Sequence, residues 1–96
     1  MKYDNFIYCF SPEKNFELIK NRKISFEEII AAIEDGAILD VLEHPNTEKY
    51  SGQKVYVVDI NGYAYFVPFV KNKDNEIFLK TIFPSRKLTK KYLRKG

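Results

Sequence analysis

The dipeptide Asn61-Gly62 constrains the fold more than any other feature of this sequence. Two residues alone separate two runs rich in apolar and β-branched side chains, 54–60 and 63–70. Asn-Gly favours a type I′ turn, whose twist matches that of two antiparallel strands, so the pattern predicts a β-hairpin. A two-residue turn also fixes the register, which pairs Ile60 with Tyr63, Val58 with Tyr65, and Tyr56 with Val67.

Both faces of this predicted hairpin are largely apolar, so both need cover from other elements. We expect two N-terminal helices on one face, and a C-terminal helix or a partner on the other. Pro68 lies within the second strand and has no amide hydrogen for a further strand. It therefore predicts a bulge or a broken ladder at that point.

Start and stop signals place the two N-terminal helices. Ser11 and Pro12 begin a helix over 12–22, in which Phe16 and Ile19 stand one turn apart. The stretch Ser25-Phe26-Glu27-Glu28 has the pattern of a capping box, and Gly36 supplies a stop. Between them the apolar residues follow the i, i+3, i+4, i+7 spacing of a helix that faces a core, namely Phe26, Ile29, Ile30 and Ile33.

The rest of the chain completes an α+β domain over residues 1–96. Strands are predicted at 38–43 and 77–83, with a polar turn at 71–75 and a further short strand within 6–10. A last helix is predicted at 86–94, after Pro84 and Ser85. The predicted architecture is two N-terminal helices packed on a four-stranded, mostly antiparallel sheet, followed by a basic C-terminal helix.

Charge is sorted along the chain. Residues 25–48 carry seven acidic side chains and no Lys or Arg, whereas residues 76–96 carry seven Lys and Arg and one acidic side chain. A domain with this polarity favours association with charged partners. One cysteine excludes an internal disulfide, and no apolar run is long enough to span a membrane, so we expect a cytoplasmic protein that does not bind membranes.

Few residues suit catalysis by familiar routes. The sequence has no glycine-rich phosphate loop, and a single histidine cannot build a zinc site, so no metal or cofactor is expected. Cys9 has no recognisable nucleophile context, and His44 is interpreted as a turn residue. In the helix 86–94, Leu88 and Tyr92 mark the buried side. The remaining surface carries five cations and is suited to binding phosphates: Arg86, Lys87, Lys90, Lys91 and Arg94. The alternative is that these cations only keep the domain soluble.

Two stretches, SPEKNFELIKNRKISFEEI and SRKLTKKYL, resemble the BrnT family of small toxins, a branch of the RelE-like ribonuclease fold. The resemblance covers nearly the whole chain. The opening Asp-Pro-x-Lys and Ser-Phe-Glu-Glu of that family fall on 11–14 and 25–28. Its closing Ser-Ala-Arg-Lys-Ala-Thr falls on 84–89.

The resemblance implies a metal-independent ribonuclease of a type II toxin–antitoxin system, in which the 2′-hydroxyl of the RNA attacks the adjacent phosphate. It assigns catalytic roles to Arg86, Lys14 and Lys80, and the cations Lys87, Lys90, Lys91 and Arg94 would bind RNA. The implied partner is an antitoxin protein, commonly of the ribbon-helix-helix type, and a dimer within that complex is compatible with it.

A second interpretation stays open. Phe10 stands where the family often has Trp, and residues 21–23 read Asn-Arg-Lys where it usually has Lys-His-Gly. The alternative is therefore a non-enzymatic module on the same fold that binds a protein partner or RNA.

Overall fold

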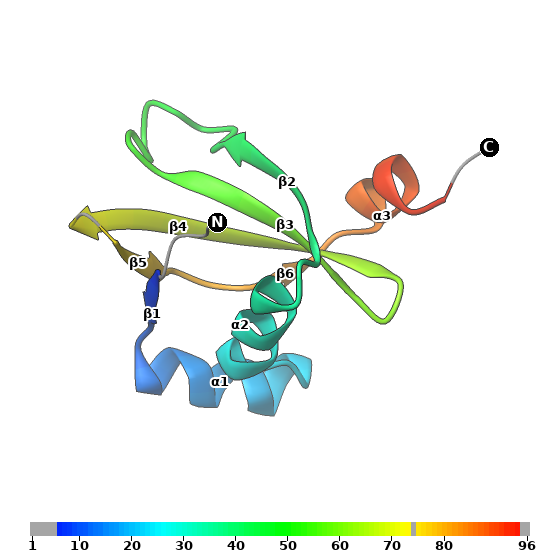
Figure 1. Ribbon diagram of the computed structural model, residues 1–96, viewed down its shortest axis with the longest axis horizontal. Helices are drawn as coiled ribbons and strands as arrows, with labels where there is room; N and C mark the ends of the chain where they lie inside the picture. The colour runs from blue at the N-terminus through cyan, green and yellow to red at the C-terminus, as the bar shows by residue number, and fades with distance from the viewer. Residues whose placement is uncertain (1–5, 74, 95–96) are drawn as a thin grey trace.

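The computed structural model describes residues 6–73 and 75–94 and has an α+β fold, as predicted (Figure 1). The helices are α1 (Pro12–Arg22), α2 (Phe26–Glu34) and α3 (Arg86–Tyr92). The strands are β1 (Ile7–Cys9), β2 (Ile38–Glu43), β3 (Lys54–Ile60), β4 (Tyr63–Lys73), β5 (Glu76–Leu79) and β6 (Phe83–Pro84).

A mixed sheet of six strands replaces the four that the sequence predicted. Its order is β1-β5-β4-β3-β2, and β6 pairs with β4. β1 is parallel to β5, and the other pairs are antiparallel. The number differs because the short strand predicted within 6–10 joins the sheet as β1, and because the strand predicted at 77–83 is split in two.

The split occurs opposite Pro68, as the missing amide hydrogen predicted. β5 pairs with β4 as far as Leu79 opposite Phe69, and pairing resumes with Phe83 opposite Phe66. Three residues, 80–82, thus face two on β4, which is the predicted bulge. The Pro68 carbonyl still accepts from the Lys80 N–H at 2.8 Å, but residues 80–82 leave the ladder. The prediction of a continuous strand over 77–83 is therefore wrong.

The predicted hairpin register is confirmed at every pair from Ile60–Tyr63 to Lys54–Phe69. Asn61 and Gly62 both have positive φ, at 53° and 83°, as a type I′ turn requires. The Asp59 carboxylate accepts from the Gly62 N–H at 2.9 Å and supports the turn. β4 continues to Lys73, so the predicted polar turn over 71–75 begins later than expected.

Both predicted helix starts are confirmed. The Ser11 hydroxyl accepts from the Lys14 N–H, and Ser25 and Glu28 form the reciprocal bonds of a capping box. Asn15 joins the two helices, because its side chain accepts from the Phe26 N–H at 2.7 Å and donates to the Glu27 carboxylate at 2.8 Å. This buried asparagine is a contact that the sequence did not predict.

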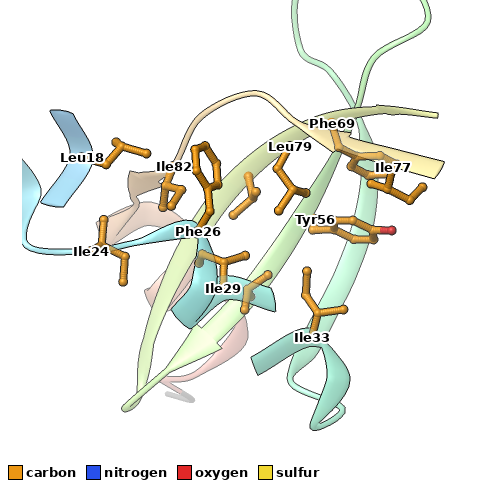
Figure 2. Close-up of a cluster of buried hydrophobic side chains, with 12 residues drawn as sticks. Leu18, Ile24, Phe26, Ile29, Ile33, Tyr56, Phe69, Ile77, Leu79 and Ile82 are labelled. Atoms are coloured by element: carbon orange, nitrogen blue, oxygen red, sulfur yellow. The ribbon is translucent and has the colours of Figure 1, made fainter. Parts of the chain in front are cut away.

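The main core lies between α1, α2 and one face of the sheet, here called the helix-covered face (Figure 2). α2 supplies Phe26, Ile29 and Ile33, as its spacing predicted. α1 is turned so that Leu18 is buried, whereas Phe16 and Ile19 are exposed. The sheet contributes apolar side chains that include Tyr56, Val58, Val67, Phe69, Ile77 and Leu79, and Ile82 follows from the bulge.

The opposite face of the sheet is covered in part by α3, so the prediction of two covered faces holds for the hairpin. Val55, Val57 and Ala64 are fully buried there. The last helix is shorter than the predicted 86–94 and ends at Tyr92. Its buried residue is Thr89 rather than Leu88 or Tyr92, which are half-buried.

Candidate functional site

Specific polar contacts fix α3 against the sheet. The Ser85 hydroxyl caps the helix by accepting from the Leu88 N–H at 3.1 Å. The buried Thr89 hydroxyl accepts from the Ala64 N–H on β4 at 2.8 Å and donates to the Ser85 carbonyl. The Tyr92 hydroxyl donates to the Asp40 carboxylate on β2 at 2.5 Å. α3 therefore spans β4 and β2 on the face opposite α2.

The exposed side of α3, together with Arg94 two residues beyond its end, presents five cations: Arg86, Lys87, Lys90, Lys91 and Arg94. The two ion pairs found among the described residues are Lys14–Glu17 and Lys54–Glu43, and neither involves α3. Unpaired cations on one helix attract a polyanion, because phosphates can replace their counterions. This group of five is called the basic surface below.

Four residues of the acidic block 25–48 lie on the other side of the sheet from α3. α2 carries Glu27, Glu28 and Glu34, and Asp35 caps it. Its apolar side packs against Tyr56 and Val58, which point away from α3. Figure 1 shows α1 and α2 below the strands and α3 at the right, above the turn of the β3–β4 hairpin. The sheet therefore separates these four carboxylates from the basic surface, whereas the Asp40 carboxylate lies on the α3 face and accepts from the Tyr92 hydroxyl.

A row of four rings crosses the same face as α3. Ring centroids are 6.2 Å apart from Phe83 to Phe66, 5.9 Å from Phe66 to His44, and 4.3 Å from His44 to Tyr50. Phe66 and Ala64 stand two apart on β4, so the row lies beside α3. Lys49 lies over the Tyr50 ring at one end. These four rings are called the aromatic row.

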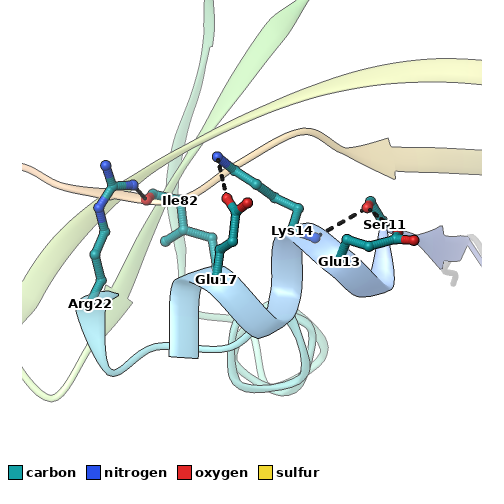
Figure 3. A network of polar contacts seen from close by, with 6 residues as sticks. All are labelled: Ser11, Glu13, Lys14, Glu17, Arg22 and Ile82. Atoms are coloured by element: carbon teal, nitrogen blue, oxygen red, sulfur yellow. Dashed lines mark hydrogen bonds and ion pairs between the residues drawn. The ribbon is translucent and has the colours of Figure 1, made fainter. Parts of the chain in front are cut away.

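Arg22 lies at the other end of the aromatic row and was not predicted as a site residue. Its guanidinium is 4.6 Å from the Phe83 ring centroid and donates to the Ile82 carbonyl at 2.7 Å (Figure 3). Ile82 belongs to the bulge, so Arg22 satisfies a carbonyl that has left the ladder. Nothing in the local sequence marks Arg22, because its two partners lie about 60 residues away.

The three predicted catalytic cations occupy different places. Arg86 is exposed as the first residue of α3, and its side chain makes no hydrogen bond or ion pair with the described residues. Lys14 lies on the same side of α1 as Arg22, where its amine is 3.9 Å from the Glu17 carboxylate (Figure 3). Lys80 is exposed at the bulge, with its amine 5.4 Å from the Phe78 ring centroid. No hydrogen bond or ion pair among the described residues joins any two of the three.

The contacts of His44 and Cys9 indicate structural rather than catalytic roles. His44 follows β2 in a turn, as interpreted from the sequence, and its Nδ1 accepts from the Asn46 N–H at 3.1 Å. Burial and the Glu76 carboxylate raise the pKa of the Cys9 thiol, which lies 3.7 Å from that carboxylate. The thiol is therefore protonated near neutral pH and unsuited to nucleophilic attack.

In the described part of the chain, no group of His, Cys, Asp or Glu is arranged to hold a metal ion. No helix formed by the described residues is long and apolar enough to cross a bilayer. Comparison with models of known families, with curated proteins and with solved structures finds no match to this chain.

Proposed function

We propose that this protein binds single-stranded RNA on the basic surface and aromatic row, and cleaves it without metal as a toxin of the BrnT kind. The observation that carries the proposal is the juxtaposition, on one face of the sheet, of four rings with five cations that form no ion pair with a described residue. Cations hold the backbone of a single strand, and aromatic rings stack with its bases. In the aromatic row Phe83 is exposed and the other three rings are half-buried. The RelE-like architecture and the antitoxin partner belong to this proposal too.

The proposed chemistry needs few groups from the protein. The 2′-oxygen of one nucleotide forms a bond to the adjacent phosphorus, the bond to the 5′-oxygen breaks, and the proton lost by the 2′-hydroxyl is balanced by one delivered to the 5′-oxygen. Cations stabilise the extra negative charge of the phosphorane between these events. Arg86 is suited to this role because its planar guanidinium can donate to two phosphate oxygens.

Arg22 adds a second guanidinium at the corner between α1 and β6. It is held on Phe83, only three residues before Arg86. An RNA strand that follows α3 past Phe83 would therefore meet Arg86 and Arg22 before it reaches Lys14. In this scheme Lys14 and Lys80 bind flanking phosphates.

The second candidate is a module that binds RNA without cutting it. The separation of Lys14, Lys80 and Arg86 favours it, since no contact among the described residues holds them as one unit. Both candidates require the basic surface, and cleavage alone distinguishes them.

The test measures binding and cleavage of a fluorescent single-stranded RNA with EDTA present. Reversal of Lys87, Lys90 and Lys91 to Glu should weaken binding by at least tenfold and flatten its salt dependence. A matched control reverses Lys20, Lys54 and Lys71, which lie on or beside the helix-covered face and change the net charge equally. Equal weakening by both sets would contradict the proposed surface, and binding without cleavage would select the second candidate.

A further inference from the structure

The helix-covered face of the sheet is not covered along its whole length. Val58 is fully buried beneath α2, whereas Val41 on β2, nearer the far end, is 47% exposed. Ile33, in the last turn of α2, is the helical residue that borders this end. No described helix packs beyond it.

A cavity of about 550 Å³ occupies the uncovered end, a size typical of binding sites. Its walls are mainly apolar and aromatic side chains of β1 to β5 and of α2, including Tyr8, Ile33, Val41, Tyr56, Phe69 and Ile77. Tyr56 and Phe69 stack with centroids 4.0 Å apart and together form part of the cavity floor (Figure 2).

The polar groups of this cavity favour an anionic partner. Lys54 and Lys71 project from the same face of the sheet as Tyr56 and Phe69, and both line the cavity. The Lys54 amine forms an ion pair with the Glu43 carboxylate at 4.0 Å, whereas the Lys71 amine lies over the Phe6 ring. Burial raises the pKa of Tyr8 and of Tyr56, so their phenols stay neutral and do not repel a carboxylate.

We propose that this cavity is the docking site for an amphipathic helix of a partner protein, with an apolar stripe flanked by acidic residues. A helix laid there would continue the layer that α2 begins on the same face, which is the usual way to bury an open sheet surface. Its acidic residues would meet Lys54 and Lys71. This inference adds to the proposed function a binding site for the protein partner. It rests on the proposed function only in assuming that such a partner exists.

The probe is a labelled synthetic peptide of about 18 residues, long enough to form a stable bound helix, with a leucine stripe flanked by glutamates. A second peptide has lysines in place of the glutamates. Titration of the full chain without RNA should show that the acidic peptide binds at least tenfold tighter than the basic one.

Variants locate the binding site. Val41→Lys should weaken acidic-peptide binding by tenfold or more, because it places an amine on the apolar floor. Ile7→Lys is the matched control: Ile7 is 56% exposed on β1 and pairs with Glu76, so it faces the other side of the sheet from Tyr8. Reversal of Lys54 and Lys71 to Glu should exchange the preference between the two peptides.

Several outcomes would overturn the inference. The first is that the acidic peptide does not bind. The second is that Val41→Lys and Ile7→Lys weaken its binding equally. The third is that reversal of Lys54 and Lys71 to Glu leaves the preference for the acidic peptide unchanged. Tighter binding of decanoate in competition with the peptide would indicate a small amphiphile instead. A dimer that Val41→Lys dissociates would indicate a second copy of this chain. RNA binding by Val41→Lys should equal that of the wild type. If the peptide-docking proposal fails, the proposal of RNA binding can therefore still be tested on its own.

Discussion

Arg22 and Phe83 form a stacked pair that connects the end of α1 to the start of the basic surface. The guanidinium lies 4.6 Å from the ring centroid and also donates to the Ile82 carbonyl at 2.7 Å. One side chain thus supports the corner where the sheet is interrupted and where Arg86 begins α3. The pair explains how a strand break opposite Pro68 is accommodated in the fold.

Arg22→Ala should lower the free energy of unfolding by about 1–2 kcal/mol, since it removes a charged hydrogen bond and a cation–π contact at an exposed position. Arg22→Lys should recover only part of this loss, because an ammonium lacks the planar surface that stacks on Phe83. Urea denaturation measures both. Lys20→Ala, on the same helix but with no contact to β6, should change stability by less than about 0.5 kcal/mol. An Arg22→Ala protein as stable as the wild type would show that the contact is not maintained in solution.

Thr89→Val should lower stability by about 1–3 kcal/mol, because it leaves the buried Ala64 N–H without an acceptor. Thr89→Ser keeps the hydroxyl and is the matched comparison. Thermal unfolding should place the serine variant nearer the wild type. A valine variant as stable as the wild type would show that the hydrogen bond to the Ala64 N–H does not hold α3.

The contact between Tyr92 and Asp40 should contribute stability only within a window of pH. The Tyr92 hydrogen bond lowers the pKa of Asp40 below its ordinary 3.8, so this contribution is present above that value and lost as pH falls through the lowered pKa. The same contact raises the pKa of Tyr92 above 10.0, so its contribution is present below that value and lost as pH rises through the raised pKa. The stability difference between wild type and Tyr92→Phe should therefore be largest between about pH 4 and 10. Urea titrations at several pH values measure it, and a difference independent of pH would exclude this contact as its source.

If the protein cleaves RNA as proposed, Arg86→Ala should lower the cleavage rate on the order of 10² to 10³-fold, which is typical for loss of one transition-state contact. Arg86→Lys should also reduce the rate, because an amine cannot donate to two phosphate oxygens in the same geometry. Neither variant should change stability by more than about 0.5 kcal/mol, since the side chain makes no contact that supports the fold. Growth arrest on expression without antitoxin, and cleavage by purified protein, are the two measurements. Undiminished arrest by Arg86→Ala at the same expression level would remove Arg86 from the catalytic site.

Asn15→Ala should destabilise the protein by about 1–3 kcal/mol, because the Phe26 N–H is buried and loses its acceptor. Asn15→Asp retains an acceptor but places a second carboxylate beside Glu27, so it should be less stable at pH 7 than at pH 4. Comparing the three proteins at both values tests the link between α1 and α2. A pH-independent Asn15→Asp variant would contradict the contact with Glu27.

The helix starts, the hairpin register and the broken ladder at Pro68 were predictable from the sequence. Each depends on residues close together in the chain: Ser11 and Lys14, Ser25 and Glu28, or a two-residue turn between Ile60 and Tyr63. Local hydrogen bonds and steric limits decide such features. The candidate cations on α3 were likewise visible as a run of Lys and Arg without acidic residues.

Tertiary structure alone decided which distant groups meet. Arg22 reaches Ile82 and Phe83, Thr89 reaches Ala64, and Tyr92 reaches Asp40 across separations of 25 to 61 residues. The rotation of α1 that buries Leu18 and exposes Phe16, and the aromatic row around His44, also depend on packing between separate elements. The local sequence does not predict these pairings. Each depends on the shape and the unsatisfied polar groups of a distant segment, which only folding brings into contact.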